Sequence, residues 1–189
     1  MLSMKTPILC NGLTAVLLSA TGIAPAADVH QHGRAEAAVV LEGKALTVSF
    51  RAPLMDILGT EQPPVDAPAR RRYDQRLADI TPPVPSSEAG CDLEEATLSN
   101  VDTLFPEAAG DHHAHAHAHD HEDKPDTHGH HVDVENEWIF VCQSPADLQA
   151  VSLPFLNTFS GLTTEVILLL PGGQNALRLA PGDTRIPLE

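Results

Sequence analysis

The sequence predicts a mainly β domain at the borderline with the α+β class, an antiparallel sheet or sandwich with two or three short helices. Apolar and polar side chains alternate over residues 46–51, and within residues 133–143 the side chains of Trp138, Phe140 and Cys142 are expected on one face, with Ile139 and Val141 on the other. Residues 166–170 form a continuous apolar run. A period of two is typical of half-buried strands, and a short apolar run suits a central strand, with a short buried helix as the alternative.

The first elements in chain order are a hairpin and a short helix. Residues 34–51 are expected to form the hairpin, because two strand-like segments flank Gly43, a suitable turn residue. The helix is expected over residues 52–59, since Pro53 suits a first helical turn and Gly59 suits a helix end. The hairpin should therefore lead directly into the helix.

A second helix is expected over residues 66–80. Asp66 can cap it and Pro82-Pro83 stop it. Three apolar side chains share one face: Tyr73, Leu77 and Ile80. Four arginines fall largely off that face: Arg70, Arg71, Arg72 and Arg76. They could form an anion site, although a solvated helix face is the preferred interpretation.

The remaining strands are expected in the second half of the chain. Residues 91–101, 133–143 and 166–170 each predict one strand. Gly172-Gly173 should then turn the chain into residues 175–179.

Charge limits the classes of partner. The chain has 189 residues with 26 acids and 11 bases, a net charge of −15, and its length suits one domain. Proteins that bind nucleic acid or anionic membranes present a basic face to phosphates, so both classes are excluded. Cations are the expected partners.

Residues 1–26 have the features of a signal peptide. They hold one charged side chain, Lys5, ahead of an apolar run from Ile8 to Ile23, and they end in small residues that suit a signal peptidase. A membrane anchor is the alternative, but the run is too short and too interrupted to cross about 30 Å of hydrocarbon. Cleavage after Ala26 should leave residues 27–189 as one β-rich domain without membrane insertion.

Two cysteines remain after the leader, which contains Cys10. In an oxidising compartment an isolated pair usually forms a disulfide, here between Cys91 and Cys142. The alternatives are a thiolate metal ligand or a nucleophile. Neither cysteine belongs to a CxxC motif, and no histidine lies within five residues of either one.

The histidines are confined to two places. Two follow the leader, His30 and His32, and nine lie within residues 107–131, which we call the histidine tract. The nine are His112, His113, His115, His117, His119, His121, His128, His130 and His131. Because the tract has no large apolar side chain, it cannot offset its ordering entropy and is expected to be a mobile insertion.

The spacing in the tract suits a transition metal. Histidines recur at every second residue from His113 to His121, which places imidazoles about 6.5–7 Å apart on one face of an extended chain. Imidazole suits zinc, copper, nickel and iron, and the surrounding carboxylates attract cations, so the tract predicts transition-metal binding without specifying the metal. A pH-responsive spacer or low-complexity drift is the alternative explanation. We expect several sites of moderate affinity with fast release.

The order of these features resembles the ZrgA-like family of secreted zinc-responsive, zinc-binding proteins. The chain has a His-x-His-Gly segment at residues 30–33, a helix-end turn at 59–62, Cys91, the histidine tract, and an aromatic-x-Cys pattern at 140–142. The family turn carries Phe-Glu-His where this chain has Thr60-Glu61-Gln62. No ligand is therefore assigned to Gln62.

The resemblance implies a periplasmic protein of Gram-negative bacteria that binds zinc and supports its uptake. Such a protein would buffer or chaperone Zn²⁺ and pass it to the periplasmic binding protein of a zinc ABC importer. The alternative is an envelope protein-binding module in which the tract is an incidental linker. An enzyme is not expected, because the sequence contains neither HExxH nor GxSxG.

Overall fold

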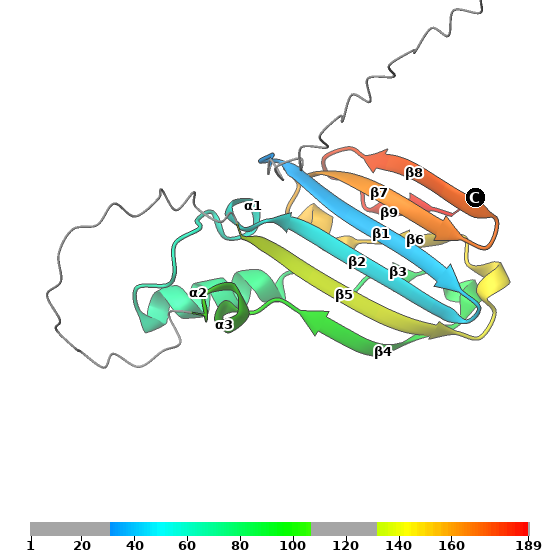
Figure 1. Cartoon of the computed structure of the whole chain (residues 1–189), viewed down its shortest axis with the longest axis horizontal. Helices are drawn as coiled ribbons and strands as arrows, with labels where there is room; N and C mark the ends of the chain where they lie inside the picture. The colour runs from blue at the N-terminus through cyan, green and yellow to red at the C-terminus, as the bar shows by residue number, and fades with distance from the viewer. Residues whose placement is uncertain (1–30, 107–131, 189) are drawn as a thin grey trace, which may run out of the picture.

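The computed structural model describes residues 31–106 and 132–188, which form one six-stranded sheet and one three-stranded sheet (Figure 1). The predicted mainly β class is confirmed. The predicted signal peptide and the histidine tract lie outside the described residues, so the structure does not test the expected cleavage or the expected mobility of the tract.

Nine strands and three α-helices occur in the described part of the chain. The strands are β1 (Arg34–Glu42), β2 (Ala45–Pro53), β3 (Val84–Pro85), β4 (Cys91–Leu98), β5 (Asp133–Cys142), β6 (Ala150–Ser152), β7 (Thr163–Leu170), β8 (Gly173–Leu179) and β9 (Arg185–Pro187). The α-helices are α1 (Leu54–Leu58), α2 (Ala67–Ala78) and α3 (Val101–Leu104). Short 3-10 helices are η1 (Ser87–Ala89), η3 (Pro145–Asp147) and η4 (Pro154–Asn157).

The large sheet has the strand order β4-β5-β2-β1-β7-β8. Its neighbours are antiparallel except β1 and β7, which run parallel. The expectation of an antiparallel sheet is therefore wrong for this pair. Residues 143–162 cross from the end of β5 to the start of β7, where Thr163 N donates to Gly33 O at 2.9 Å. Strands β5 and β7 run in the same direction within the sheet, and a connection between such strands needs a crossover of about this length.

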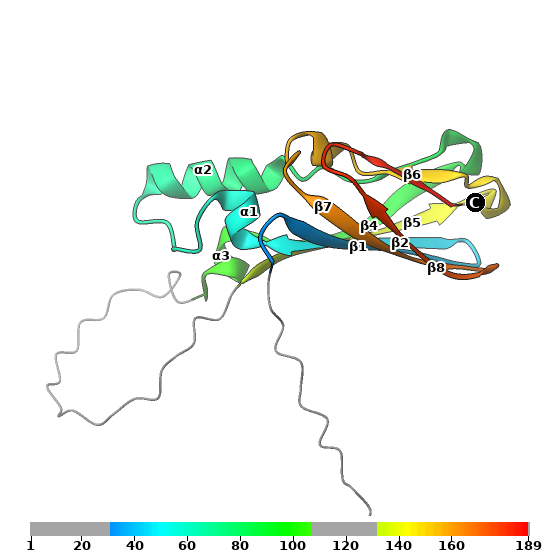
Figure 2. The same ribbon diagram turned by 90° about the horizontal axis from the view of Figure 1, so that it is seen from above.

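The small sheet, α1 and α2 lie to one side of the large sheet, whereas α3 lies level with its end, and Figure 2 shows this arrangement edge-on. The core between the layers is built on fully buried rings. The Phe155 ring lies 4.8 Å from that of Phe50 and 6.1 Å from that of Trp138, centroid to centroid. Phe155 belongs to η4, so the crossover itself supplies the side chain that closes the core.

The predicted local elements form as expected. Gly43 turns the β1-β2 hairpin with φ +58°, and Gly59 ends α1 with φ +76°. Both values lie in the left-handed region that favours glycine. Asp66 caps α2, because its side chain accepts a hydrogen bond of 2.6 Å from Ala69 N.

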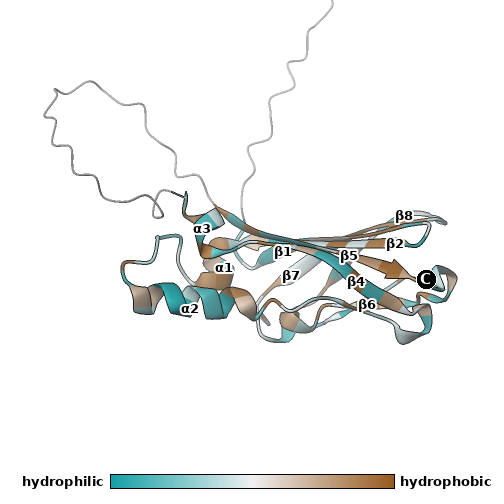
Figure 3. Cartoon of the chain, turned by 90° about the horizontal axis from the view of Figure 1, so that it is seen from below, coloured by the Kyte–Doolittle hydropathy of each residue, from teal (hydrophilic) through white to brown (hydrophobic). Residues whose placement is uncertain are grey.

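The apolar run at residues 166–170 belongs to strand β7, so the alternative of a short buried helix is wrong. Only alternate side chains of this strand are buried: Val166 and Leu168 are 1% exposed, whereas Ile167 and Leu169 are 48% and 41% exposed. Polar and apolar residues mix along the strands and α2 (Figure 3). The second face of the sheet therefore presents apolar as well as polar side chains.

Cys91 and Cys142 face each other across β4 and β5 and form a disulfide, as predicted. Cys142 is fully buried. Strand β5 begins beside α1, where Asp133 pairs with Pro53, and ends at the disulfide. The bond therefore closes the end of the sheet that lies away from α1.

Candidate metal site

One predicted ligand falls within the described residues, and that ligand is His32. The other predicted ligands lie outside the described residues: His30, His112, His113, His115, His117, His119, His121, His128, His130 and His131. The structure therefore gives the surroundings of His32 and the positions of Pro106 and Val132, the described residues on either side of the histidine tract.

His32 occupies a tight turn that leads into β1. Arg34 N donates to Gln31 O at 3.1 Å, which closes the turn, and Gly33 has φ +76°. A positive φ at the third residue of a four-residue turn is the conformation that glycine supplies without strain. The glycine of the His-x-His-Gly segment thus sets the backbone from which His32 projects.

Asp56 of α1 holds this turn in place. Its Oδ2 accepts a hydrogen bond from Gly33 N at 2.9 Å. The same Oδ2 lies 4.0 Å from His32 Nδ1, with the Asp56 side chain 18% exposed and that of His32 61% exposed. A sheltered carboxylate therefore stands next to an accessible imidazole.

The described residues on either side of the histidine tract lie at the end of the domain that carries α1. Leu54 N, at the start of α1, donates to Val132 O at 2.9 Å, and Val132 directly follows the histidine tract in the sequence. Pro106 follows α3, and both views place α1 and α3 at the same end of the large sheet (Figures 1 and 2). The His32 turn and the two points that flank the histidine tract thus share this end of the domain.

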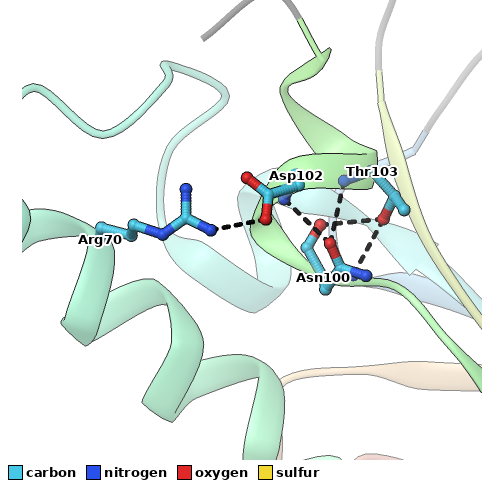
Figure 4. Close-up of polar contacts among 4 residues, drawn as sticks. All are labelled: Arg70, Asn100, Asp102 and Thr103. Carbon is cyan, nitrogen blue, oxygen red and sulfur yellow. Dashed lines mark hydrogen bonds and ion pairs between the residues drawn. The ribbon is translucent and has the colours of Figure 1, made fainter. Parts of the chain in front are cut away.

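Helix α3 is tied to α2 by an ion pair (Figure 4). Arg70 Nη2 lies 2.7 Å from Asp102 Oδ2. The hydrogen bond from Arg70 lowers the pKa of Asp102 and is also the main reason that the pKa of Arg70 is raised. The depressed carboxyl pKa stabilises the folded chain above the ordinary carboxyl range, and this contribution is lost as the pH falls through the lowered value.

The start of α3 is fixed by a reciprocal cap. Asn100 Oδ1 accepts hydrogen bonds from Asp102 N and Thr103 N, both at 3.0 Å, and Thr103 Oγ1 accepts one from Asn100 N at 2.9 Å. This cap satisfies backbone N–H groups that a helix start leaves without partners. It also ends β4 at Leu98, so the strand is shorter than the predicted 91–101.

The four arginines of α2 do not act together. Arg70 pairs with Asp102. The Arg76 guanidinium lies 4.5 Å from the centroid of the Phe159 ring, and Arg76 Nε donates to Ile57 O at 2.9 Å. Arg71 and Arg72 are exposed. Two of the four are therefore occupied in packing α2, which favours the solvated helix face over an anion site.

His32 and Asp56 form a pair rather than a full ligand set. Within residues 31–106 and 132–188, no group of three or more His, Cys, Asp or Glu side chains is placed to hold a metal ion. The same residues include no helix with the length and apolar character needed to cross a bilayer.

Comparison with known proteins gives the family. A search of curated protein sequences finds no significant match. A family model described as ZrgA family zinc uptake protein matches residues 29–188, a range that includes His30, the His32 turn and the histidine tract. The chain therefore belongs to the ZrgA family of zinc uptake proteins.

Proposed function

We propose that the protein is a periplasmic zinc carrier that buffers Zn²⁺ and delivers it to the binding protein of a zinc ABC importer. The observation that carries this proposal is the placement of the histidines. All eleven lie in the segment after the leader or in the histidine tract, and the remaining mature chain has none. Membership of a zinc uptake family supports zinc over nickel and copper as the cargo.

The tract has the chemistry of a cation reservoir. Imidazole nitrogens bind zinc at about 2.0–2.1 Å, and two neighbouring rings can contact one ion. Five carboxylates stand among the histidines: Asp111, Asp120, Glu122, Asp123 and Asp126. Their negative potential concentrates divalent cations and adds oxygen ligands. Several sites of moderate affinity suit a protein that takes up and releases its cargo.

Two features support an extracytoplasmic location. Residues 1–26 have the pattern of a signal peptide. The Cys91–Cys142 disulfide suits an oxidising compartment such as the periplasm. Release of weakly held zinc near the membrane would then supply an importer's binding protein.

A carrier is favoured over an enzyme. A catalytic zinc site needs three protein ligands held rigidly with one open position. The described residues provide the His32–Asp56 pair and no set of three. Zinc uptake as the family role agrees with cargo binding, in which the ion itself is transferred and no bond in a substrate is broken.

Zinc titration at two pH values tests the proposal. We expect several equivalents to bind near pH 7, with affinity falling at least about sevenfold for each coordinated imidazole at pH 5.5. The neutral fraction of a histidine with a pKa near 6.5 falls from about three quarters to about one tenth over this range, and only the neutral ring binds metal. Calorimetry at fixed ionic strength measures both quantities. Affinity that is equal at both pH values would mean that carboxylates hold the ion.

A further inference from the structure

Asp56 and His32 are brought together by the fold and not by the sequence. Asp56 lies 23 residues after Gly33 in the chain, and the hydrogen bond from Gly33 N to Asp56 Oδ2 brings the two segments together. The turn at Gly33 directs His32 toward α1, and α1 begins where β2 ends. The two side chains are therefore positioned by backbone segments that adjoin strands β1 and β2 of the large sheet.

The distance between the two donors fits a shared metal ion. Two ligands at about 2.0–2.1 Å from one tetrahedral zinc lie about 3.3 Å apart. His32 Nδ1 and Asp56 Oδ2 are 4.0 Å apart, so a small rotation of the exposed imidazole would bring both onto one ion. A direct hydrogen bond between them would need about 2.7–3.2 Å, which makes 4.0 Å too long for an orienting contact.

The Asp56 carboxylate has the capacity to bind an ion while it holds the turn. A carboxylate offers about four lone-pair positions, and the hydrogen bond from Gly33 N uses one of them. That bond also fixes the carboxylate before any metal arrives, which lowers the ordering cost of binding. The side chain is 18% exposed, so it is sheltered and still open to an ion approaching from the His32 side.

We propose that Asp56 is a zinc ligand and forms, with His32, a half-site for Zn²⁺ at the start of β1. This inference rests on the proposed function and adds a folded binding position to it. Water fills the remaining coordination positions, so the ion is held by two protein ligands and leaves readily. The half-site lies at the same end of the sheet as Pro106 and Val132, the described residues that flank the histidine tract.

The test uses the full mature chain with the nine tract histidines replaced by alanine, which we call the tract-alanine variant. We expect it to bind about one zinc ion weakly and to lose this binding when His32→Ala is added. Asp56→Asn in the same background should weaken the residual binding about tenfold or more. Asparagine keeps an oxygen that accepts the Gly33 hydrogen bond, so the change removes mainly the charge. Asp92→Asn, an exposed acid on β4, is the matched control and should leave the binding unchanged.

A second measurement does not depend on any change to Asp56. Zinc added to the tract-alanine variant should shift the NMR signals of the His32 ring nitrogens and the Asp56 side-chain carboxyl carbon in the same titration step. A shift of His32 without Asp56, undiminished affinity in Asp56→Asn, or the absence of any residual site would each overturn the inference. These outcomes leave the tract's role intact, because that role is tested by the equivalents that the tract-alanine variant loses relative to the native sequence.

Discussion

Replacing the nine tract histidines with alanine is expected to reduce the zinc bound by the mature protein from several equivalents to about one weak equivalent. The physical reason is the loss of every imidazole in the tract, since alanine offers no metal ligand at neutral pH. Equilibrium dialysis against micromolar zinc, followed by metal analysis, measures the number of ions bound. Thermal unfolding should be unaffected, because the core is built from residues outside the tract.

The matched control changes the acids of the same segment and keeps its histidines. Replacing Asp111, Asp120, Glu122, Asp123 and Asp126 with their amides should lower zinc affinity while several equivalents still bind. The two variants separate ligation by imidazole from attraction by charge. A tract-alanine variant that binds as many ions as the native sequence would show that the tract is an incidental linker.

Replacing Cys91 and Cys142 with alanine is expected to lower the free energy of unfolding by about 4 kcal/mol in the chain-entropy model. The bond closes a loop with a sequence separation of 51 residues, so its removal enlarges the unfolded ensemble. Loss of the fully buried Cys142 sulfur adds a packing cost in the same direction. Urea unfolding of the native and variant proteins measures the difference.

Reductant provides the control for the disulfide. It should lower the unfolding midpoint of the native protein and leave that of the double variant unchanged. Zinc binding under folded conditions should not change, because the disulfide and the His32 turn lie at opposite ends of the large sheet. Equal unfolding free energies in the two proteins would contradict a stabilising role for this bond.

Local patterns account for the parts of the fold that the sequence predicts. The hairpin turn at Gly43, the end of α1 at Gly59 and the cap of α2 at Asp66 depend on residues within a few positions of each other. Alternation in β5 also correctly predicts its buried side, on which Trp138 and Phe140 lie.

The parts that sequence patterns do not predict depend on distant or very short segments. The parallel pairing of β1 with β7 joins distant residues such as Arg34 and Thr163. The sequence pattern of a single strand does not indicate which strand it pairs with or in which direction. Strands β3 and β9 contain two and three residues, too few for a period to be visible. Helix α3 contains four residues, and its cap at Asn100 and Thr103 is the single local signal.

The candidate site also has a part that the sequence predicts and a part that only the structure reveals. Histidine composition is what predicts His32 and the tract as candidate ligands, because a prediction of this kind depends on residue type and spacing. Asp56 is not identifiable from its neighbours, since it is one acid within an apolar helix. Its importance appears only when the hydrogen bond to Gly33 and the 4.0 Å approach to His32 are known.

X-ray absorption at the zinc edge tests the central claim most directly. Zinc-loaded mature protein is expected to show a first shell at about 2.0 Å together with the outer-shell scattering of imidazole rings, and this outer shell should weaken in the tract-alanine variant, whose residual zinc is held by the His32 imidazole and the Asp56 carboxylate. A native spectrum that contains oxygen ligands alone, without imidazole scattering, would contradict the account.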